Sequence, residues 1–492
     1  MADLSAALDA SLDEAPLSRF HTRSVFTAGM GFFTDAYDLF IIGVATTLIA
    51  PQWHLSSAQT GLVNSITLIS AFVGAFLFGR VADVFGRKKI YGLEAALMVG
   101  GAIASAFAPD LIWLLVFRFI LGIGVGGDYP MSATLMTEFS NRKNRGRLVG
   151  MVFAMQGLGT VAGYVAGLAL LSAHVPDGDT WRILLGLGAL PAASVLYMRR
   201  RMPESPRYTD AVLGDTGEAA RDIEGYSDGV VRVPELSGPG RAAPAAVPLG
   251  GNARRRGSMR LATFLSTPRY LLLLLGTAGS WFVFDYAYYG NSVSAPLIVK
   301  SVLGKQGAGV LTEALALQLI LFSVAAIPGY FLAVHFMDRI GHRRLQWIGF
   351  LGMGTAFLLI GVIPNLTTLV VPFLLLFGVS YFFAEFGPNT TTFVLAAEMY
   401  PTRARATGNG ISAGVAKVGA FLGVYLFPII KSDFGVAGSL KLCFGMAVIG
   451  FALTLLIPEP SQRTLDDISP DEVIAVAEGV VRQHVPDTEP AA

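Results

Sequence analysis

Long apolar stretches, each interrupted by few charged residues, recur along nearly the whole chain. A helix crosses a bilayer with about 20 apolar residues, so each stretch of this length predicts one membrane span. The stretches cover residues 25–50, 60–79, 90–107, 111–134, 147–172, 182–199, 270–297, 311–335, 345–363, 368–395, 406–430 and 438–457. The pattern therefore predicts an all-α integral membrane protein with twelve transmembrane helices.

Three polar segments divide these spans. Residues 1–24 carry several acids and lack the apolar core of a signal peptide. Residues 203–268 are rich in Gly, Pro, Asp and Arg, which predicts a cytoplasmic linker with one short surface helix and a flexible middle. We expect an N-terminal segment (1–24), a first six-helix half (25–202), the linker (203–268), a second half (269–457) and a tail (458–492).

The basic residues of the short loops predict the orientation. They gather in alternate loops, at Arg80, Arg87, Lys88, Lys89, Arg142, Lys143, Arg145, Arg147, Arg199, Arg200, Arg201, Arg339, Arg343, Arg344, Arg403 and Arg405. The opposite loops hold little besides Lys300, Lys305, Lys431 and Lys441. Because loops rich in Lys and Arg stay in the cytoplasm, both termini and the linker are expected there. We expect a multi-pass protein of a plasma or inner membrane.

The composition excludes several classes of protein. Hydrophobic residues make up 53% of the 492 residues and charged residues only 14%, against about a quarter in soluble domains. The net charge of +1 argues against a nucleic-acid binder. A single cysteine, Cys443, excludes a disulfide framework and a multi-cysteine metal site. No phosphate-binding glycine loop, metal constellation or catalytic triad is recognisable, so we expect no cofactor and no enzyme activity.

An internal repeat relates the two halves. The segment from Asp83 to Lys88 recurs from Asp338 to Arg343, and Pro203-Glu204 recurs as Pro458-Glu459, both at an offset of 255 residues. Glu138 and Arg145 recur as Glu398 and Arg405 at an offset of 260, and the stretches bearing Asp35 and Asp285 align at 250. Parallel repeats of this kind place a substrate site near the bilayer midplane, between halves that rock about it.

Several motifs resemble those of known transporters. The loop from Gly79 to Lys89 resembles the loop 2–3 motif of the major facilitator superfamily, and Pro203 to Arg207 resembles a half-end motif of its sugar-porter-like branch. The segments 29–40, 126–134 and 385–393 resemble the phosphate:proton symporter family. The resemblance implies the major facilitator fold, two pseudo-symmetric six-helix halves, and inward transport of inorganic phosphate with protons.

The candidate substrate site combines a helix stripe with hydrogen-bond donors. Trp281, Asp285 and Tyr289 stand at i, i+4 and i+8 and share one helix face. The amides Gln156 and Asn389 suit an oxyanion because their NH₂ groups donate, although amides also connect helices structurally. The resemblance implies that these five residues and Tyr129 contact phosphate. The alternative for Trp281 and Tyr289 is an interfacial aromatic belt.

Lys417 lies inside the eleventh predicted span, where an unpaired cation is costly. It must therefore pair with an anion, and the sequence leaves substrate and Asp285 open as partners. Glu385 lies four residues before Asn389 on the same helix face and is a third possible partner.

Carboxylates inside spans are candidate proton carriers. Asp35 and Asp38 share one face of the first helix, and neighbouring carboxylates favour each other's protonation. Asp128 follows a run of glycines that permits close helix packing, and its alternative role is a packing-face acid. We assign proton coupling to Asp35, Asp38, Asp128 and Asp285. Arg118 is a possible partner for Asp128, but it lies ten residues earlier, nearly three turns away.

Further charges near the helix ends predict a gate. We assign to it Asp83, Arg87, Glu94, Arg118, Glu138, Arg145, Glu398 and Arg405, which would hold the halves together when the cytoplasmic side is closed. Matching of helix dipoles and the ordinary excess of positive charge in cytoplasmic loops are the alternative explanation.

Three functions are consistent with the sequence. The first is proton-coupled import of inorganic phosphate, with arsenate expected as a chemically similar cargo and a monomer as the functional unit. The second is transport of a sugar, organic acid or organophosphate, since the half-end motifs are shared with sugar porters. The third is a phosphate sensor that signals through the linker and tail.

Overall fold

The computed structural model describes residues 2–233, 259–304 and 309–468. Every regular element within these ranges is a helix. The predicted flexible middle of the linker, Lys305 and most of the tail lie outside the described residues.

The N-terminal half is built from the first six predicted spans. Its helices are α2 (Arg19–Gln52), α3 (Ser57–Phe85), α4 (Arg87–Ile90), α5 (Leu93–Ala106), α6 (Leu111–Phe139), η1 (Arg142–Asn144), α7 (Arg145–Ser172), α8 (Asp177–Leu187) and α9 (Ala189–Arg199). The third span is only 14 residues long and is preceded by the short α4. The sixth span consists of α8 and α9, which meet at Gly188.

A close approach of Asp38 explains why Gly188 lies at the junction of α8 and α9. A Cβ atom added to Gly188 would lie 2.5 Å from Asp38 Oδ1. Only a residue without a side chain leaves room for this buried carboxyl.

The C-terminal half follows the linker. Its helices are α13 (Pro268–Val293), α14 (Ala295–Leu303), α15 (Val310–Leu321), η4 (Phe322–Ala326), α16 (Ile327–Ile340), α17 (His342–Val362), η5 (Leu366–Thr368), α18 (Val370–Ala384), η6 (Glu385–Asn389), α19 (Thr390–Glu398) and α20 (Arg405–Thr454). The short α12 (Leu261–Ser266) ends the linker, and α21 (Leu465–Ile468) lies in the tail. The last two predicted spans run together in the 50-residue α20, which bends at Gly435 with φ 68°.

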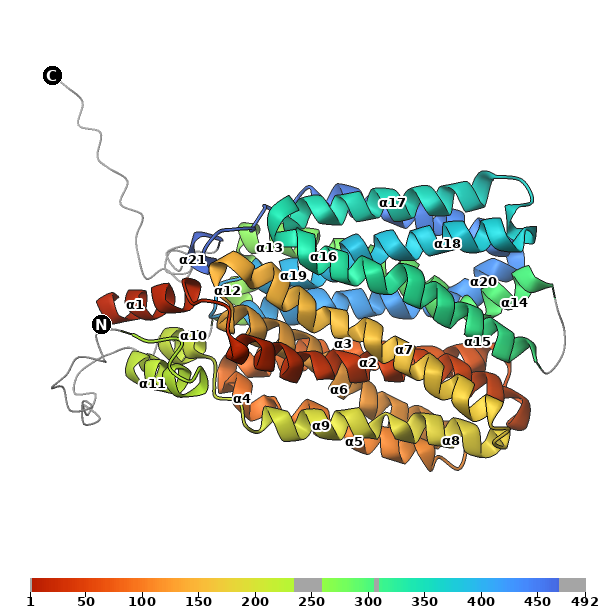
Figure 1. The fold of residues 1–492 in the computed structure, drawn as a ribbon, viewed down its shortest axis with the longest axis horizontal. Helices are drawn as coiled ribbons and strands as arrows, with labels where there is room; N and C mark the ends of the chain where they lie inside the picture. Colours follow the sequence, from red (N-terminus) through yellow and green to blue (C-terminus); the bar gives the residue numbers. More distant parts are fainter. Residues whose placement is uncertain (1, 234–258, 305–308, 469–492) are drawn as a thin grey trace, which may run out of the picture.

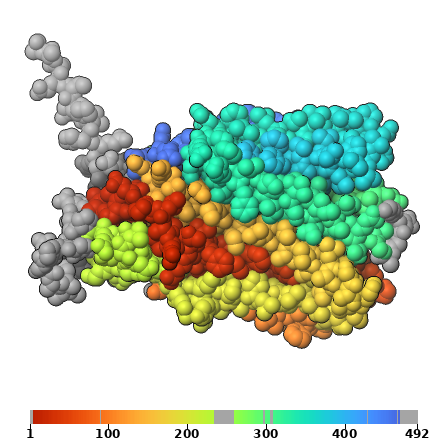
Figure 2. Space-filling view, viewed as in Figure 1, coloured from red at the N-terminus to blue at the C-terminus, as the bar shows by residue number. Residues whose placement is uncertain are grey.

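The predicted number of spans is confirmed for the described residues. Eleven helices are long and apolar enough to cross a membrane, and the shorter apolar helix Leu93–Ala106 makes twelve. The spans lie roughly parallel, with the N-terminal half beside the C-terminal half (Figure 1). On the face drawn in Figure 2 the two halves lie directly against each other.

One end of the bundle, called here the terminal end, carries α1 (Ala2–Asp13) and the linker helices α10 (Pro206–Tyr208) and α11 (Thr216–Tyr226) (Figure 1). The π-helical turn η2 (Thr209–Leu213) connects the two linker helices. The linker therefore contains more helix than the single short one predicted, and α1 was not predicted. Apolar side chains of α11 explain its docking, because Ala219, Ala220 and Ile223 are buried.

Two helix crossings join the halves, and each has a glycine at a point of close approach. Gly79 of α3 faces α20, where an added Cβ would lie 2.6 Å from the carbonyl oxygen of Ala406. In the second crossing Gly157 of α7 faces Tyr330 of α16, whose ring atoms would lie 3.0 Å from an added Cβ. The sequence repeat relates α3 to α16 and α7 to α20. The crossing of α3 with α20 is therefore the equivalent of the crossing of α16 with α7.

The repeat is also visible in individual hydrogen bonds. Glu204 accepts hydrogen bonds from the backbone N–H groups of Arg87 and Lys88, both at 3.1 Å. Its repeat mate Glu459 accepts the corresponding bonds from His342 at 2.9 Å and Arg343 at 3.1 Å. Acids placed at the start of a helix satisfy its free N–H groups. The half-end motifs therefore stabilise the loop motif of their own half.

Candidate functional site

A buried ion pair lies at the interface between the halves. Lys417 Nζ on α20 lies 2.9 Å from Asp285 Oδ2 on α13. The same ammonium lies 3.4 Å from the hydroxyl of Tyr289, and 4.4 Å above the ring of Tyr129 from the other half. Of the two acidic side chains left open as partners for Lys417, Asp285 and Glu385, the structure therefore places Asp285 against it. Both charged side chains are almost completely buried, so neither is compensated by water.

A row of hydrogen bonds extends from this ion pair. Gln156 Nε2 donates to Tyr289 OH at 3.2 Å, and Gln156 Oε1 accepts from Tyr330 OH at 3.4 Å. Asn389 Nδ2 in turn donates to Tyr330 OH at 2.8 Å and to Glu385 Oε2 at 2.5 Å. Amides and phenols from both halves thus form a connected row.

The local backbone explains why these residues meet. The i, i+4 spacing of α13 points Trp281, Asp285 and Tyr289 the same way, and the indole lies 6.0 Å from the ring of Tyr129. In the tenth span, Gly387 adopts a non-helical φ of −123° and ψ of −105° directly before Pro388. Proline disrupts regular helix geometry, so the span bends at the segment that carries Asn389.

The N-terminal half holds two further buried charge clusters. In the first, Arg118 NH1 lies 3.7 Å from Asp38 Oδ1, and its NH2 donates to the Asp38 carbonyl oxygen at 2.8 Å. In the second, Arg199 pairs with Glu94 at 2.8 Å and also with Asp128. Asp128 therefore pairs with Arg199. Arg118, the possible partner that the sequence offered for Asp128, pairs with Asp38 instead.

Asp35 differs from Asp38 and Asp128 because it forms no ion pair with the described residues. It is completely buried, and neither carboxyl oxygen makes a hydrogen bond to the described residues. It interacts electrostatically with Asp128 and Arg199. A carboxylate without a bonded partner is costly in such surroundings, so the site accommodates the protonated form of Asp35.

The terminal end carries an ion network that joins the halves. Arg87 pairs with Asp83 and with Glu138, both at 3.1 Å, and Arg405 of the other half pairs with the same Glu138 at 3.1 Å. Asp83 Oδ2 also accepts two hydrogen bonds of 2.7 Å, from the backbone N–H and the hydroxyl of Thr407. An acid of one half therefore binds the first turn of the other half's helix.

The repeat produces a reciprocal contact. Asp338 Oδ2 of the C-terminal half accepts a 2.8 Å hydrogen bond from the backbone N–H of Arg147, in the first turn of α7. His342 stands where the first half has Arg87, and lies 3.2 Å from Asp338 and 3.0 Å from Glu398. The halves are thus held together by two equivalent contacts.

The remaining residues predicted for the gate lie outside the network of Asp83, Arg87, Glu138 and Arg405. Glu398 pairs with His342 in the reciprocal contact. Arg145 lies 3.4 Å from Asp13 of α1 and donates to the carbonyl of Arg463 at 3.2 Å. Glu94 and Arg118 belong to the clusters of the N-terminal half described above. The structure therefore joins four predicted gate residues directly: Asp83, Arg87, Glu138 and Arg405.

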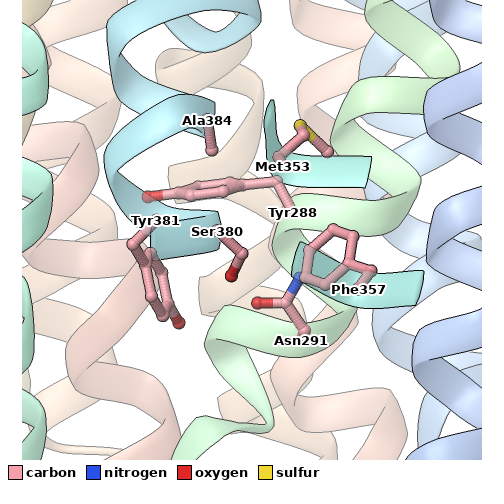
Figure 3. A pocket seen from close by; sticks show the side chains of 7 residues that line it. All are labelled: Tyr288, Asn291, Met353, Phe357, Ser380, Tyr381 and Ala384. Atoms are coloured by element: carbon pink, nitrogen blue, oxygen red, sulfur yellow. The ribbon is translucent and has the colours of Figure 1, made fainter. Parts of the chain in front are cut away.

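A pocket within the C-terminal half has neither Lys417 nor Asp285 in its lining. It is lined by Tyr288, Asn291, Met353, Phe357, Ser380, Tyr381 and Ala384. Figure 3 shows Tyr288 and Tyr381 beside Ala384, the residue before Glu385. The pocket is too narrow for a water-sized sphere.

Comparison with known proteins identifies the family. The family model described as "Sugar (and other) transporter" matches residues 24–471. A probable inorganic phosphate transporter 1-12 of Oryza sativa subsp. japonica is 35% identical, over 93% of each chain. A low affinity inorganic phosphate transporter 8 of Medicago truncatula is 36% identical, over 94% of this chain and 92% of that one. The chain belongs to this transporter family.

Solved structures show the same fold. A major facilitator superfamily proton:xylose symporter, XylE, bound to 6-bromo-6-deoxy-D-glucose has a TM-score of 0.76 at 19% identity, over 93% of this chain and all of that chain. XylE from E. coli in a partially occluded inward open conformation has a TM-score of 0.69 at 19% identity, over 90% and 99% of the two chains. The predicted major facilitator fold is confirmed.

Three residues that take part in these buried contacts were not singled out from the sequence: Tyr330, Arg199 and His342. Tyr330 lies in an apolar span without a motif. Arg199 was counted among the basic residues of a loop, next to Arg200 and Arg201, although its side chain is completely buried. His342 could have been found, because it is the repeat mate of Arg87.

Proposed function

We propose that the chain imports inorganic phosphate together with protons by alternating access. The observation that carries this proposal is the Lys417–Asp285 ion pair, buried between the halves among phenol and amide donors. Membership of the family, and the names of the relatives that are 35% and 36% identical, support phosphate as the cargo.

The proposed phosphate site is formed by Tyr129, Gln156, Trp281, Asp285, Tyr289, Asn389 and Lys417. The phenol, amide and indole groups donate hydrogen bonds, and Lys417 supplies the positive charge that an anion requires. All seven side chains are buried, so the site is occluded in this conformation. Arsenate, which has the same shape and charge, is expected to compete.

Coupling follows from competition for Lys417. Phosphate and the carboxylate of Asp285 both need this single ammonium, and together they would bring excess negative charge into a dry site. A proton on Asp285 releases Lys417 to phosphate. Each ligand therefore favours the binding of the other.

The proton reaches this site through the carboxyls of the N-terminal half. Asp38, Asp128 and Asp35 are all completely buried. The ion pairs of Asp38 and Asp128 compensate their charges, whereas Asp35 has no bonded partner among the described residues. We assign proton transfer to Asp35, Asp38 and Asp128, and the final coupling step to Asp285.

The terminal end is assigned to the cytoplasm. It carries the basic loops, α1 and the linker helices α10 and α11, and loops rich in Lys and Arg stay in the cytoplasm. We propose that residues 25–202 and 269–457 rock as two bodies about the site, with 1–24, 203–268 and 458–492 in the cytoplasm. The protein then acts as a monomer in a plasma or inner membrane.

The ion network at the terminal end acts as the cytoplasmic latch in this scheme. Replacing Asp83 by asparagine weakens the bonds to Arg87 and Thr407, and should favour opening on the cytoplasmic side. We expect labelling of a cysteine introduced at the buried Ala406 to become roughly fivefold faster, equivalent to ~1 kcal/mol. The exposed Asp222→Asn is the control, in a background without Cys443. Unchanged accessibility on both faces would refute the latch.

Uptake of radiolabelled phosphate into proteoliposomes tests the function. Phosphate should accumulate when the outside is more acidic, and unlabelled phosphate and arsenate should compete, whereas xylose, citrate and glycerol phosphate should not. Competition by one of the last three would favour the alternative class of cargo. Phosphate binding without any flux would favour a sensor.

A further inference from the structure

A second buried carboxyl lies close to the proposed phosphate site, in the C-terminal half. Glu385 is completely buried, and its Oε1 makes no hydrogen bond to the described residues. Among the described residues, no lysine or arginine is found among the groups that act on this carboxyl. In this respect it differs from Asp285, which has Lys417. Since an unpaired buried carboxylate is costly, this conformation accommodates the protonated acid.

The helices packed against η6 present only neutral groups to this carboxyl. Tyr288 of α13, Tyr330 of α16 and Tyr381 of α18 interact with it electrostatically. From its own helix it receives the amide of Asn389, and α17 contributes the uncharged Gly349, which lies against Pro388. The surroundings therefore provide hydrogen bonds to Glu385 and no compensating positive charge.

A single amide connects Glu385 to the phosphate site. Asn389 Nδ2 donates both to Glu385 Oε2 at 2.5 Å and to Tyr330 OH at 2.8 Å, and Tyr330 donates to Gln156. Because phosphate is proposed to recruit Asn389 and Gln156 as donors, its binding withdraws a donor from Glu385. An ionised Glu385 would then lose its closest hydrogen bond and face the charge of the anion.

From this arrangement we propose that Glu385 is a second proton-coupling residue, which carries one proton inward in each transport cycle. The proton comes from the outer solution, stays on the carboxyl while phosphate is bound, and passes to the cytoplasm after phosphate leaves. The pocket of Figure 3 is lined by Tyr288 and Tyr381, two of the tyrosines that interact electrostatically with this carboxyl. The inference rests on the proposed phosphate transport and adds a proton to its stoichiometry.

The stoichiometry of the Glu385→Gln variant tests this assignment. Purified full-length protein is reconstituted, the membrane potential is held at zero, and the phosphate gradient at which net flux stops is measured at a fixed pH difference. Glutamine keeps the hydrogen bonds of a protonated acid but carries no exchangeable proton. One proton fewer should lower the gradient sustained by one pH unit about tenfold. Wild type and Glu385→Gln are exposed to the same ionic forms of phosphate at each pH. The difference between their phosphate gradients therefore measures the difference in the number of protons transported.

Counterflow of labelled against unlabelled phosphate, which needs no net proton movement, should stay within about twofold of wild type. An unchanged stoichiometry in Glu385→Gln would overturn the inference, and equal loss of counterflow and coupling would assign Glu385 to phosphate binding instead. Glu385→Asp, which keeps a carboxyl, should keep the wild-type stoichiometry. If wild type itself shows no phosphate accumulation driven by the pH difference, the proposed function fails, and not this assignment alone.

Should the glutamine variant fail to fold, Tyr330→Phe provides the second test. It leaves both carboxyls in place and removes only the hydroxyl between Asn389 and Gln156. Uptake driven by the pH difference should fall about tenfold while counterflow persists. A proportional fall in both rates, or no change in either, would contradict the connection.

Discussion

Replacing Asp285 by asparagine is expected to abolish accumulation of phosphate driven by a pH gradient. The asparagine cannot take up or release a proton, so Lys417 is available to phosphate at every pH and the two fluxes are no longer linked. Accumulation should fall at least about tenfold, the effect of one pH unit on one proton, while counterflow of phosphate continues. Radiolabelled uptake and counterflow in the same proteoliposomes measure both quantities.

The matched control for this variant is Asp433→Asn, because Asp433 is exposed and lies two residues before the bend of α20 at Gly435. It should accumulate phosphate like the wild type. If Asp285→Asn accumulates phosphate at the wild-type level, Asp285 does not couple the proton. Loss of counterflow as well would show that its main role is in binding or folding.

Replacing Arg199 by methionine is expected to be among the most destabilising single substitutions in the chain. Arg199 compensates two buried acids, Glu94 and Asp128, and it also donates to Ser132 at 2.9 Å. Removing one partner of a buried ion pair costs about 3–5 kcal/mol, because a charge is left without compensation. The loss in free energy of unfolding should shrink as the pH falls, since protonation of the two acids removes the stranded charges.

Thermal unfolding in detergent at several pH values measures this effect. The neighbouring Arg200 is exposed, so Arg200→Met should leave the unfolding temperature unchanged. Arg199→Lys keeps the charge and should recover part of the stability. A Met variant as stable as wild type above neutral pH would mean that the Arg199 cluster does not stabilise the fold.

Hydrophobic patterning was sufficient to predict the architecture. Twelve spans follow from apolar length, and the repeat identifies two related halves, because equivalent residues such as Glu204 and Glu459 perform the same local task. Departures from regular spans were not predictable. The junction at Gly188 depends on the carboxyl of Asp38 from a different helix, and a single-sequence pattern contains no information on that contact.

The sequence named most of the residues that lie around the buried Lys417–Asp285 pair, but it missed Tyr330 and did not show which residues would pair. Helical spacing placed Asp285 and Tyr289 on one face, yet the choice of Asp285 over Glu385 as the partner of Lys417 depends on how α13 and α20 pack. Arg199 was missed for a similar reason, because a buried arginine and a loop arginine look alike in sequence. Their functional roles remain predictions that the proposed experiments test.

In the proposed mechanism the proton gradient drives phosphate uphill, so removing that gradient should release the accumulated phosphate. A pH gradient, acidic outside, is imposed on proteoliposomes that contain the protein. After phosphate has accumulated, an ionophore collapses that gradient. We predict that the accumulated phosphate flows out until its concentrations on the two sides are equal. Retention of the full phosphate gradient, with no other ion supplied, would contradict the account.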